Sequence, residues 1–428
     1  MNQTPASGVH TIETLLLFTL LQLIVIIVAA RGAGYVSVRL KQPRAVGEIV
    51  AGLLLGPSLF GALAPTPFNW LFRSIDSTPL TLISQIGLIL LMFQIGLEFD
   101  FSQLGTAVNR RVTLLVTSAG ILLPFSLGFG FGQVSAAVLA PGISPLAYSL
   151  FIAIALSITA VPILGRILME FGLTRSRLGV VTIAAAAAND AVGWVLLAVV
   201  AAISTDHFSG PAVIRQLTGL VMYLAVSWWV MRPLISRWLK RCPITAEHLP
   251  QDVLALLLAL IFGSAIVTSQ LGIFAIFGGF IAGVLLHRHH VLVRAWRARV
   301  EDLLMVFFLP IFFTYTGLRT DIGSLASGNL WGWCAGLILL AMAGKLVGCY
   351  WAARAGGLGR DEARCIAIMM NTRALMELIV INLGYDLGVL PRPVFTMLVL
   401  MAIASTLMTA PGLRLWLPAE ERLRSGRS

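Results

Sequence analysis

The chain has 428 residues, of which 58% are apolar and only 11% are charged, and its mean hydropathy is +0.91. Soluble globular chains carry about 25% charged residues, so this composition excludes a soluble enzyme. The formal net charge of +11 would suggest nucleic acid as a partner of a soluble protein, but basic loops also orient membrane proteins. We therefore expect a membrane protein without a nucleic-acid partner.

Continuous apolar runs are the dominant pattern along the chain. They are too long for the short alternating strands of a membrane β-barrel, and they suit spanning helices of about 20 residues. The sequence thus predicts an all-α polytopic membrane protein with about thirteen transmembrane helices. The expected spans are 11–31, 45–62, 79–98, 111–133, 146–168, 178–204, 212–233, 251–269, 273–287, 301–318, 330–353, 363–385 and 393–413.

The Lys and Arg residues divide unequally between the two sides that these spans define. Only Arg73, Arg215, Arg319 and Arg392 lie on one side, and nearly all the others follow odd-numbered spans or lie in the C-terminal segment. Because cytoplasmic loops carry the excess of basic residues, we expect a multi-pass protein of the cell membrane. Its N-terminus would face outward and its C-terminus the cytoplasm.

Two short motifs occur twice in the same order. Ala51-Gly52-Leu53-Leu54-Leu55 matches Ala282-Gly283-Val284-Leu285-Leu286, and residues 95–104 match residues 316–325. The copies lie an odd number of spans apart, so the second copy enters the membrane from the opposite side. Inverted repeats are typical of secondary transporters. We expect one transporter domain over 1–428, with a first repeat over 11–204, a linker helix and loop over 205–250, a second repeat over 251–413 and a short cytoplasmic tail over 414–428.

Four polar side chains lie deep within predicted spans: Thr159, Asp190, Lys345 and Arg373. The helical rise places them about 15 to 22 Å from a membrane face, where charged groups are costly and usually functional. A buried carboxylate can accept either a proton or a cation, so Asp190, with its neighbour Asn189, is the candidate ion- and proton-binding site. The alternative is a structural Asp that pairs with Lys345 or Arg373.

The fifth span contains Pro162, which lacks a backbone donor and disturbs the preceding turn. Carbonyl oxygens freed there, together with the hydroxyl of Thr159, would suit a dehydrated cation; the alternative is a plain kink. The repeat predicts a second break near 371–373, although this stretch has neither Pro nor Gly. Lys345 and Arg373 are interpreted as charge balance, and Glu377, four residues after Arg373, can pair with it.

Other polar residues give weaker indications. Glu48, near the cytoplasmic end of its span, is either a gating residue or an ordinary interfacial one. His287, His289 and His290 could sense pH or bind a metal, or they could belong to a solvated loop. The sequence does not decide between these roles.

Several of these segments together resemble the cation:proton antiporter family 2, especially its plant-type cation/proton exchanger branch. The matching residues are Gly47-Glu48-Ile49-Val50-Ala51-Gly52-Leu53-Leu54-Leu55-Gly56-Pro57, Asn189-Asp190, Gly344-Lys345 and Asn371-Thr372-Arg373-Ala374-Leu375-Met376-Glu377-Leu378-Ile379-Val380. The resemblance implies the sodium/proton-antiporter-like fold, with two inverted six-helix repeats, crossed and discontinuous fifth and twelfth helices, and a dimerisation domain. It also implies that Asp190 is the ion-binding carboxylate and that Thr159 is a ligand-bearing position.

The expected function is antiport of a monovalent cation, Na⁺ or K⁺, against H⁺ by alternating access. Relatives with two adjacent aspartates tend to be electrogenic, so Asn189 favours electroneutral exchange. The partners would be these ions, membrane lipids and a second copy of the chain, with no cofactor, catalytic residue or resident metal. A gated K⁺ efflux channel is the alternative within transport, and a membrane-embedded enzyme is the alternative from another class.

Overall fold

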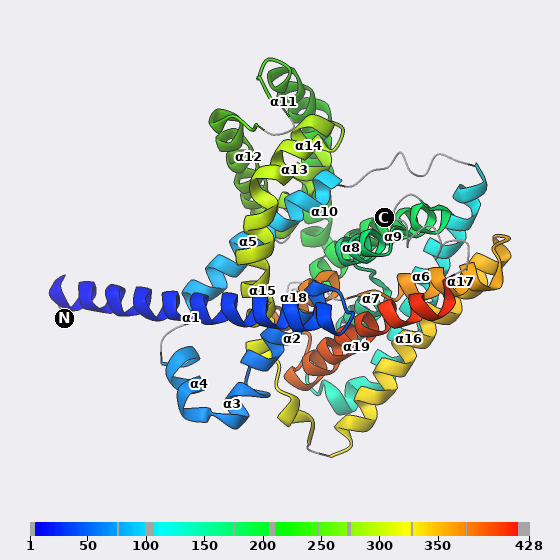
Figure 1. The fold of residues 1–428 in the computed structure, drawn as a ribbon, viewed down its shortest axis with the longest axis horizontal. Helices are drawn as coiled ribbons and strands as arrows, with labels where there is room; N and C mark the ends of the chain where they lie inside the picture. The colour runs from blue at the N-terminus through cyan, green and yellow to red at the C-terminus, as the bar shows by residue number, and fades with distance from the viewer. Residues whose placement is uncertain are drawn as a thin grey trace. The chain divides into compact units, whose positions relative to one another are not determined.

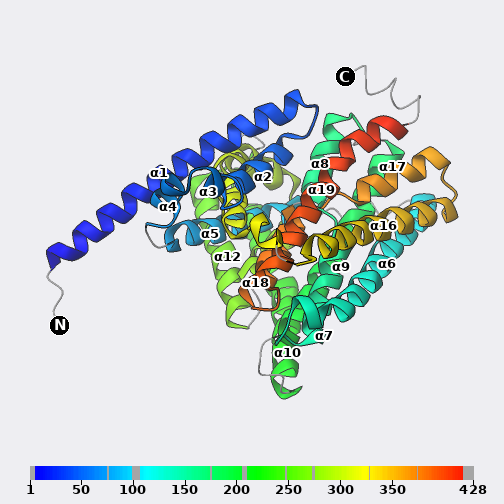
Figure 2. The same ribbon diagram turned by 90° about the horizontal axis from the view of Figure 1, so that it is seen from below.

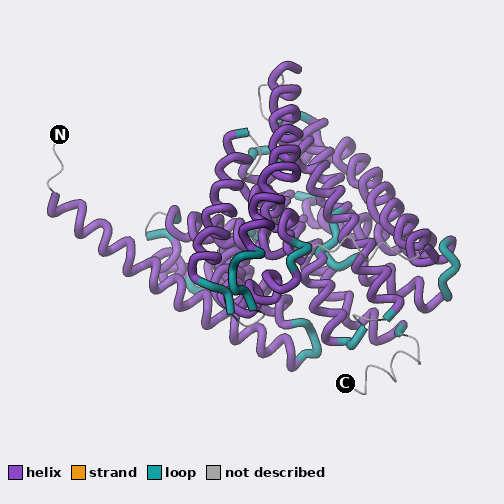
Figure 3. Tube along the Cα trace, turned by 90° about the horizontal axis from the view of Figure 1, so that it is seen from above, coloured by secondary structure: helices purple, strands orange, loops and turns teal. Residues whose placement is uncertain are grey.

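The computed structural model describes residues 5–74, 77–98, 107–173, 176–204, 210–245, 248–271, 275–326, 328–373 and 375–417. Within these residues the secondary structure is helical and no strand occurs (Figure 3). The α-helices are α1 (Pro5–Arg39), α2 (Arg44–Leu55), α3 (Phe60–Leu63), α4 (Pro65–Phe72), α5 (Thr78–Glu98), α6 (Ala107–Leu139), α7 (Pro145–Ser157), α8 (Val161–Glu170), α9 (Arg177–Ser204), α10 (Gly210–Val226), α11 (Arg232–Leu239), α12 (Gln251–Gln270), α13 (Ala275–Leu286), α14 (His290–Trp296), α15 (Leu309–Arg319), α16 (Leu330–Ala355), α17 (Arg360–Met370), α18 (Leu375–Asp386) and α19 (Arg392–Trp416). Short π-helical segments cover Ser227–Met231, Arg297–Glu301 and Leu304–Phe308, and a 3₁₀ segment covers Ile322–Ala326.

Each predicted span has a counterpart in the described chain. Ten helices are long and apolar enough to cross a membrane, and a bent pair and two shorter apolar helices account for the remaining spans. The connection between the predicted spans 273–287 and 301–318 is largely helical, because α14 and the π-helical segment Arg297–Glu301 occupy it. Leu292, Ala295 and Trp296 are buried there at helical spacing, so one apolar face stabilises a helix despite the many basic residues.

The chain forms two compact units, each assembled from segments that are distant in the sequence. The first comprises Met1–Val36, Gly47–Phe99 and Ile214–Thr320, and the second comprises Ser37–Val46, Asp100–Val213 and Asp321–Ser428. In the first unit α13 packs along α5, with α12 against α13 and α15 against α5 (Figure 1). Each predicted repeat therefore contributes helices to both units, whereas residues 418–428 of the predicted tail lie outside the described residues.

Glycines allow two pairs of helices in the first unit to meet backbone against backbone. A β-carbon on Gly52 would overlap the carbonyl of Phe313, and one on Gly317 would overlap the carbonyl of Gly52, so α2 and α15 leave no room for a side chain. Gly96 of α5 and Gly283 of α13 approach each other in the same way. These four glycines come from the two repeated motifs. The first motif of each copy contacts the second motif of the other copy. Two copies related by a two-fold axis would make these reciprocal contacts. The contacts therefore support the repeat, whose boundaries stay a prediction.

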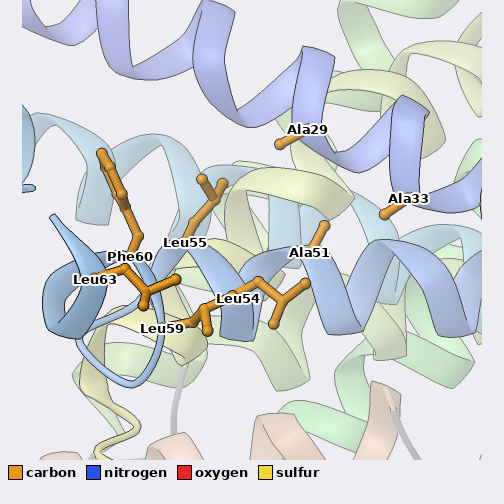
Figure 4. A pocket seen from close by; sticks show the side chains of 8 residues that line it. All are labelled: Ala29, Ala33, Ala51, Leu54, Leu55, Leu59, Phe60 and Leu63. Carbon is orange, nitrogen blue, oxygen red and sulfur yellow. The ribbon is translucent and has the colours of Figure 1, made fainter.

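A cavity of about 270 Å³ lies in the first unit between α1 and the segment from α2 to α3. Ala29 and Ala33 lie one turn apart on α1 and leave space that larger side chains line from the other side (Figure 4). The lining residues are Ala29, Ala33, Ala51, Leu54, Leu55, Leu59, Phe60 and Leu63. All are apolar, so the cavity suits a hydrocarbon chain and not an ion.

The second unit is built around two interrupted helices. One stops at Ser157 and resumes at Val161, and the other stops at Met370 and resumes at Leu375. α9 packs against the first interrupted helix and α19 against the second, while α6 packs along α7 and α16 (Figure 2). Non-helical backbone at membrane depth is tolerated only where protein buries it, and these neighbouring helices provide that burial.

Candidate functional site

The first interruption, residues 158–160, precedes the proline that predicted it. Ile158 adopts an extended backbone, with φ −71° and ψ 150°. Pro162 is the second residue of α8, where its missing N–H costs little because amides of the first helical turn have no helical partner. The predicted break is therefore present, and Pro162 lies in the first turn after it.

The two interruptions cross and satisfy each other's backbone groups. The Ala160 N–H donates to the carbonyl oxygen of Thr372 over 2.9 Å, and the Thr159 hydroxyl donates to the carbonyl oxygen of Met370 over 3.1 Å. Buried backbone groups need such partners, and here each break supplies them to the other. The second break, which the repeat predicted without any local signal, is thus stabilised by tertiary hydrogen bonds.

Oxygen atoms at the end of α7 also accept hydrogen bonds from two polar side chains of other helices. Nζ of Lys345 donates to the Ser157 carbonyl oxygen over 2.5 Å and to Oγ1 of Thr159 over 2.8 Å. Nδ2 of Asn189 donates to the same two oxygens, over 3.2 Å and 3.0 Å. Because the hydroxyl of Thr159 accepts two hydrogen bonds and donates one, its bonding capacity is filled by protein groups. In this state Thr159 fixes Lys345 and Asn189.

Asp190 follows on α9, and its side chain is buried, with 2% of its surface exposed. Within the described part of the chain neither carboxylate oxygen has a hydrogen-bond partner. The backbone N–H of Val161 is directed at the carboxylate and the charge of Lys345 acts on it, but the two hydrogen bonds of Lys345 described above go to Ser157 and Thr159. The choice between an ion-binding and a structural role for Asp190 stays a prediction.

Arg373 connects three helices of the second unit. Its guanidinium donates to the carbonyl oxygens of Ala155 and Ala341 over 3.2 Å and 3.0 Å, and lies 3.8 Å from Oε1 of Glu377. Both charged side chains are fully buried, so each offsets the charge of the other. The ion pair expected from the four-residue spacing is present, and it joins α7, α16 and α18.

Glu48 belongs to the first unit, whereas the side chains described above belong to the second. Its carboxylate is 2% exposed and lies 3.7 Å from the guanidinium of Arg31 on α1. A gating role for Glu48 stays a prediction.

The three histidines have different surroundings. His287 is buried, with its Nδ1 2.6 Å from the Val284 carbonyl oxygen; His289 is half-buried, with its Nε2 2.8 Å from Oγ of Ser236; and His290 is exposed. The described chain holds no group of three metal-binding side chains. His287 therefore contacts the end of its own helix α13 and His289 contacts α11, so only His290 of the three is exposed; a role in pH sensing stays a prediction.

We expect His289 to make the fold sensitive to mild acid. Burial, and then the charges of Arg232 and Lys240 and the nearby His287 and His290, lower the pKa of His289 below its ordinary value of 6.5. The unfolded chain therefore binds a proton at a higher pH than the folded chain, so stability is fully present above about pH 6.5 and falls as the pH drops through the window below it. His289→Gln should weaken the fall in melting temperature of the purified protein between pH 7.5 and 5.5. An identical fall in His289→Gln and wild type would show that another group is responsible.

Comparison with known proteins identifies the family. A family model described as sodium/hydrogen exchanger, transmembrane, matches residues 23–417, which include both interrupted helices. The chain belongs to the sodium/hydrogen exchanger family. It is therefore a multi-pass membrane transporter and not an enzyme, and the resemblance found in its motifs is confirmed.

Individual members of the family match over nearly the whole chain. The Na⁺/H⁺ antiporter NhaS4 of Synechocystis sp. is 38% identical over 92% of this chain and 96% of its own length. Cation/H⁺ antiporter 19 of Arabidopsis thaliana is 34% identical over 92% of this chain, which spans about half (48%) of that relative. The structure of the sodium proton antiporter MjNhaP1 from Methanocaldococcus jannaschii matches with a TM-score of 0.66 at 16% identity, over 96% of this chain and 99% of that chain. The match to MjNhaP1 confirms the antiporter-like fold.

Proposed function

We propose that this protein exchanges a monovalent cation, Na⁺ or K⁺, for H⁺, and that both ions use the carboxylate of Asp190 in turn. The observation that carries the proposal is a buried carboxylate without hydrogen-bond partners in the described chain, beside two crossed helix breaks, in a member of an exchanger family. The relatives named as Na⁺/H⁺ and cation/H⁺ antiporters support it.

Burial of Asp190 supplies the coupling between the two ions. An ionised carboxylate without a partner is very costly in a dry interior. A carboxylate that holds a proton or a monovalent cation, in contrast, has no net charge. Alternating access is therefore favourable only when the site is loaded with one ion or the other. One ion must leave before the other binds, and this competition is antiport.

The remaining site residues would prepare this carboxylate. Lys345 and Asn189, held by Thr159 and the Ser157 carbonyl, keep the end of α7 in place beside α9. The Arg373–Glu377 pair balances charge within the unit and ties α18 to α7 and α16. In this proposal Pro162 marks the start of α8, and a cation reaches Thr159 only after Lys345 moves away.

Proteoliposomes containing the purified protein and an internal pH dye test the function. A Na⁺ or K⁺ gradient, each applied separately, should drive proton movement in the opposite direction, and the comparison gives the selectivity. A gated K⁺ efflux channel would instead conduct K⁺ without obligatory proton movement. Cation flux that leaves the internal pH unchanged when the membrane potential is clamped would contradict antiport.

We expect the exchange to be electroneutral. Asn189 leaves Asp190 as the single carboxylate of its pair on α9, while the Glu377 carboxylate is paired with Arg373. If both ions use Asp190 in turn, each half-cycle carries the same charge. A membrane potential imposed on proteoliposomes without ion gradients should then cause no change in internal pH. A pH change that reverses with the sign of the potential, and that Asp190→Asn removes, would mean that a second group such as Lys345 titrates during the cycle.

We further propose that the protein resides in the cell membrane with its C-terminus in the cytoplasm, as a homodimer in contact with lipids. The distribution of Lys and Arg supports the orientation. The outward apolar side chains of α1 offer a surface for a second copy, and the cavity of Figure 4 offers space for an acyl chain. Protease accessibility of tags at the two termini tests the orientation, and cross-linking in membranes tests the dimer.

A further inference from the structure

Asn371 occupies the second break, and its side chain is fully buried. Its backbone N–H is satisfied by the carbonyl oxygens of Ala367 and Ile368, both at 3.2 Å. Within the described chain, however, neither Oδ1 nor Nδ2 of its amide has a hydrogen-bond partner. Buried polar groups are nearly always paired, and each exception calls for an explanation.

The neighbours of Asn371 place it at the crossing of the two breaks. The carbonyl oxygen before it, on Met370, accepts a hydrogen bond from Thr159, and the one after it, on Thr372, accepts from Ala160. α17, which ends at the preceding residue, also packs against α9, the helix of Asp190. Asn371 therefore lies between the two points at which the breaks are joined.

Among the described residues of this unit, buried side-chain oxygens without a hydrogen-bond partner belong to Gln42, Asn189, Asp190, Asn371 and Glu377. The Glu377 carboxylate is ion-paired with Arg373, whereas Asn189, Asp190 and Asn371 lie at the breaks or next to them. The hydroxyl of Thr159 and the carbonyl oxygens of Ser157, Met370 and Thr372 already accept hydrogen bonds. A dehydrated alkali cation needs several oxygen dipoles around it, and one carboxylate alone does not supply them.

We propose that Asn371 is a further residue of the cation site, and that its amide oxygen binds the cation held by Asp190. The proposal rests on the proposed antiport and names a residue that sets its cation affinity. A neutral amide suits this role because it adds an oxygen ligand without adding charge, so the site keeps a single titrating carboxylate. The unpaired amide is then explained as a ligand whose partner is the transported ion.

The test compares Asn371→Leu with wild type and with Asn382→Leu. Leu has the same branched skeleton of four heavy side-chain atoms as Asn. Asn382 is a matched control because it is also buried in this unit but already donates to the Leu378 carbonyl oxygen over 2.9 Å. Two readouts are needed for each purified full chain: the rise in melting temperature on titration with NaCl or KCl, at constant ionic strength with choline chloride, and proton flux in proteoliposomes.

We expect Asn371→Leu to raise the cation concentration for half-maximal stabilisation and the apparent KM about tenfold or more, since a ligand bond to a charge is lost. Its melting temperature in choline chloride should not fall, because the change removes two unpaired polar groups. Asn382→Leu should leave both cation constants unchanged. Should Asn371→Leu not fold, Asn371→Thr, which keeps one oxygen, should show a smaller increase in the same constants.

Unchanged cation constants in a folded Asn371 variant would overturn the inference, as would a wild type that neither cation stabilises. If the wild type is stabilised by the cation and Asn371→Leu is not, yet no protons move in either, the ligand role stands and the proposed antiport fails. The binding readout thus separates the two proposals.

Discussion

Asp190→Asn is expected to reduce cation-driven proton flux to the level of liposomes without protein. The amide has nearly the same shape as the carboxylate, but it cannot release a proton and carries no charge to hold a cation. Because both oxygens of Asp190 lack hydrogen-bond partners in the described chain, the change breaks no observed hydrogen bond. The variant should therefore fold normally and melt at the same temperature or higher, since a buried charge is removed.

The matched control for this variant is Asp361→Asn. Asp361 belongs to the same unit but lies exposed in the first turn of α17, paired with Arg364 over 3.1 Å. Exposed ion pairs contribute little, so this change should preserve exchange. Proton flux that persists in a folded Asp190→Asn protein would rule out Asp190 as the shared site.

Gly317→Ala should strongly destabilise the protein. The added methyl group would lie 2.8 Å from the backbone nitrogen of Leu53 and closer still to the carbonyl of Gly52. Overpacking a core costs about 1–3 kcal/mol, and sometimes more; here the obstacle is helix backbone, which cannot rotate away as a side chain can. We expect a clear loss of melting temperature and of monodisperse protein in detergent.

Gly336→Ala provides a control with the opposite expected sign. Gly336 lies within α16, and a β-carbon there would meet nothing within 4 Å. Alanine is favoured over glycine in a helix by about 1 kcal/mol, so this variant should melt slightly higher. Equal melting temperatures for the two variants would mean that α2 and α15 separate easily and that their close contact is not required.

The sequence predicted those parts of the fold and site that depend on local composition. The apolar runs gave the spans, and depth along the helices brought Thr159, Asp190, Lys345 and Arg373 together, all of which belong to one unit. The spacing of Arg373 and Glu377 predicted their ion pair. The repeated motifs predicted related copies, and the close contacts of Gly52 with Gly317 and of Gly96 with Gly283 give these motifs a physical reason.

The remaining features depend on contacts that no local pattern encodes. The break after Met370 has no Pro or Gly, and it persists because the distant Thr159 and Ala160 bind its carbonyl oxygens. For the same reason the sequence showed that Thr159 is a polar residue deep within its span. It did not show that hydrogen bonds from Lys345 and Asn189 already occupy the Thr159 hydroxyl. The role of the Ser157 carbonyl and the unpaired state of Asn371 had no sequence signal beyond their nearness to the breaks.

The hydrogen bonds between the two breaks also constrain how the protein can be made. The Thr159 hydroxyl and the Met370 carbonyl are separated by 211 residues of chain. During synthesis the first interrupted helix must therefore wait in the bilayer, with unsatisfied amides and carbonyls, until nearly the whole protein has left the ribosome. Exposed backbone groups of this kind are costly in lipid, so the nascent first half is unstable on its own. We therefore expect a chain that ends before Met370 to be unstable in the membrane.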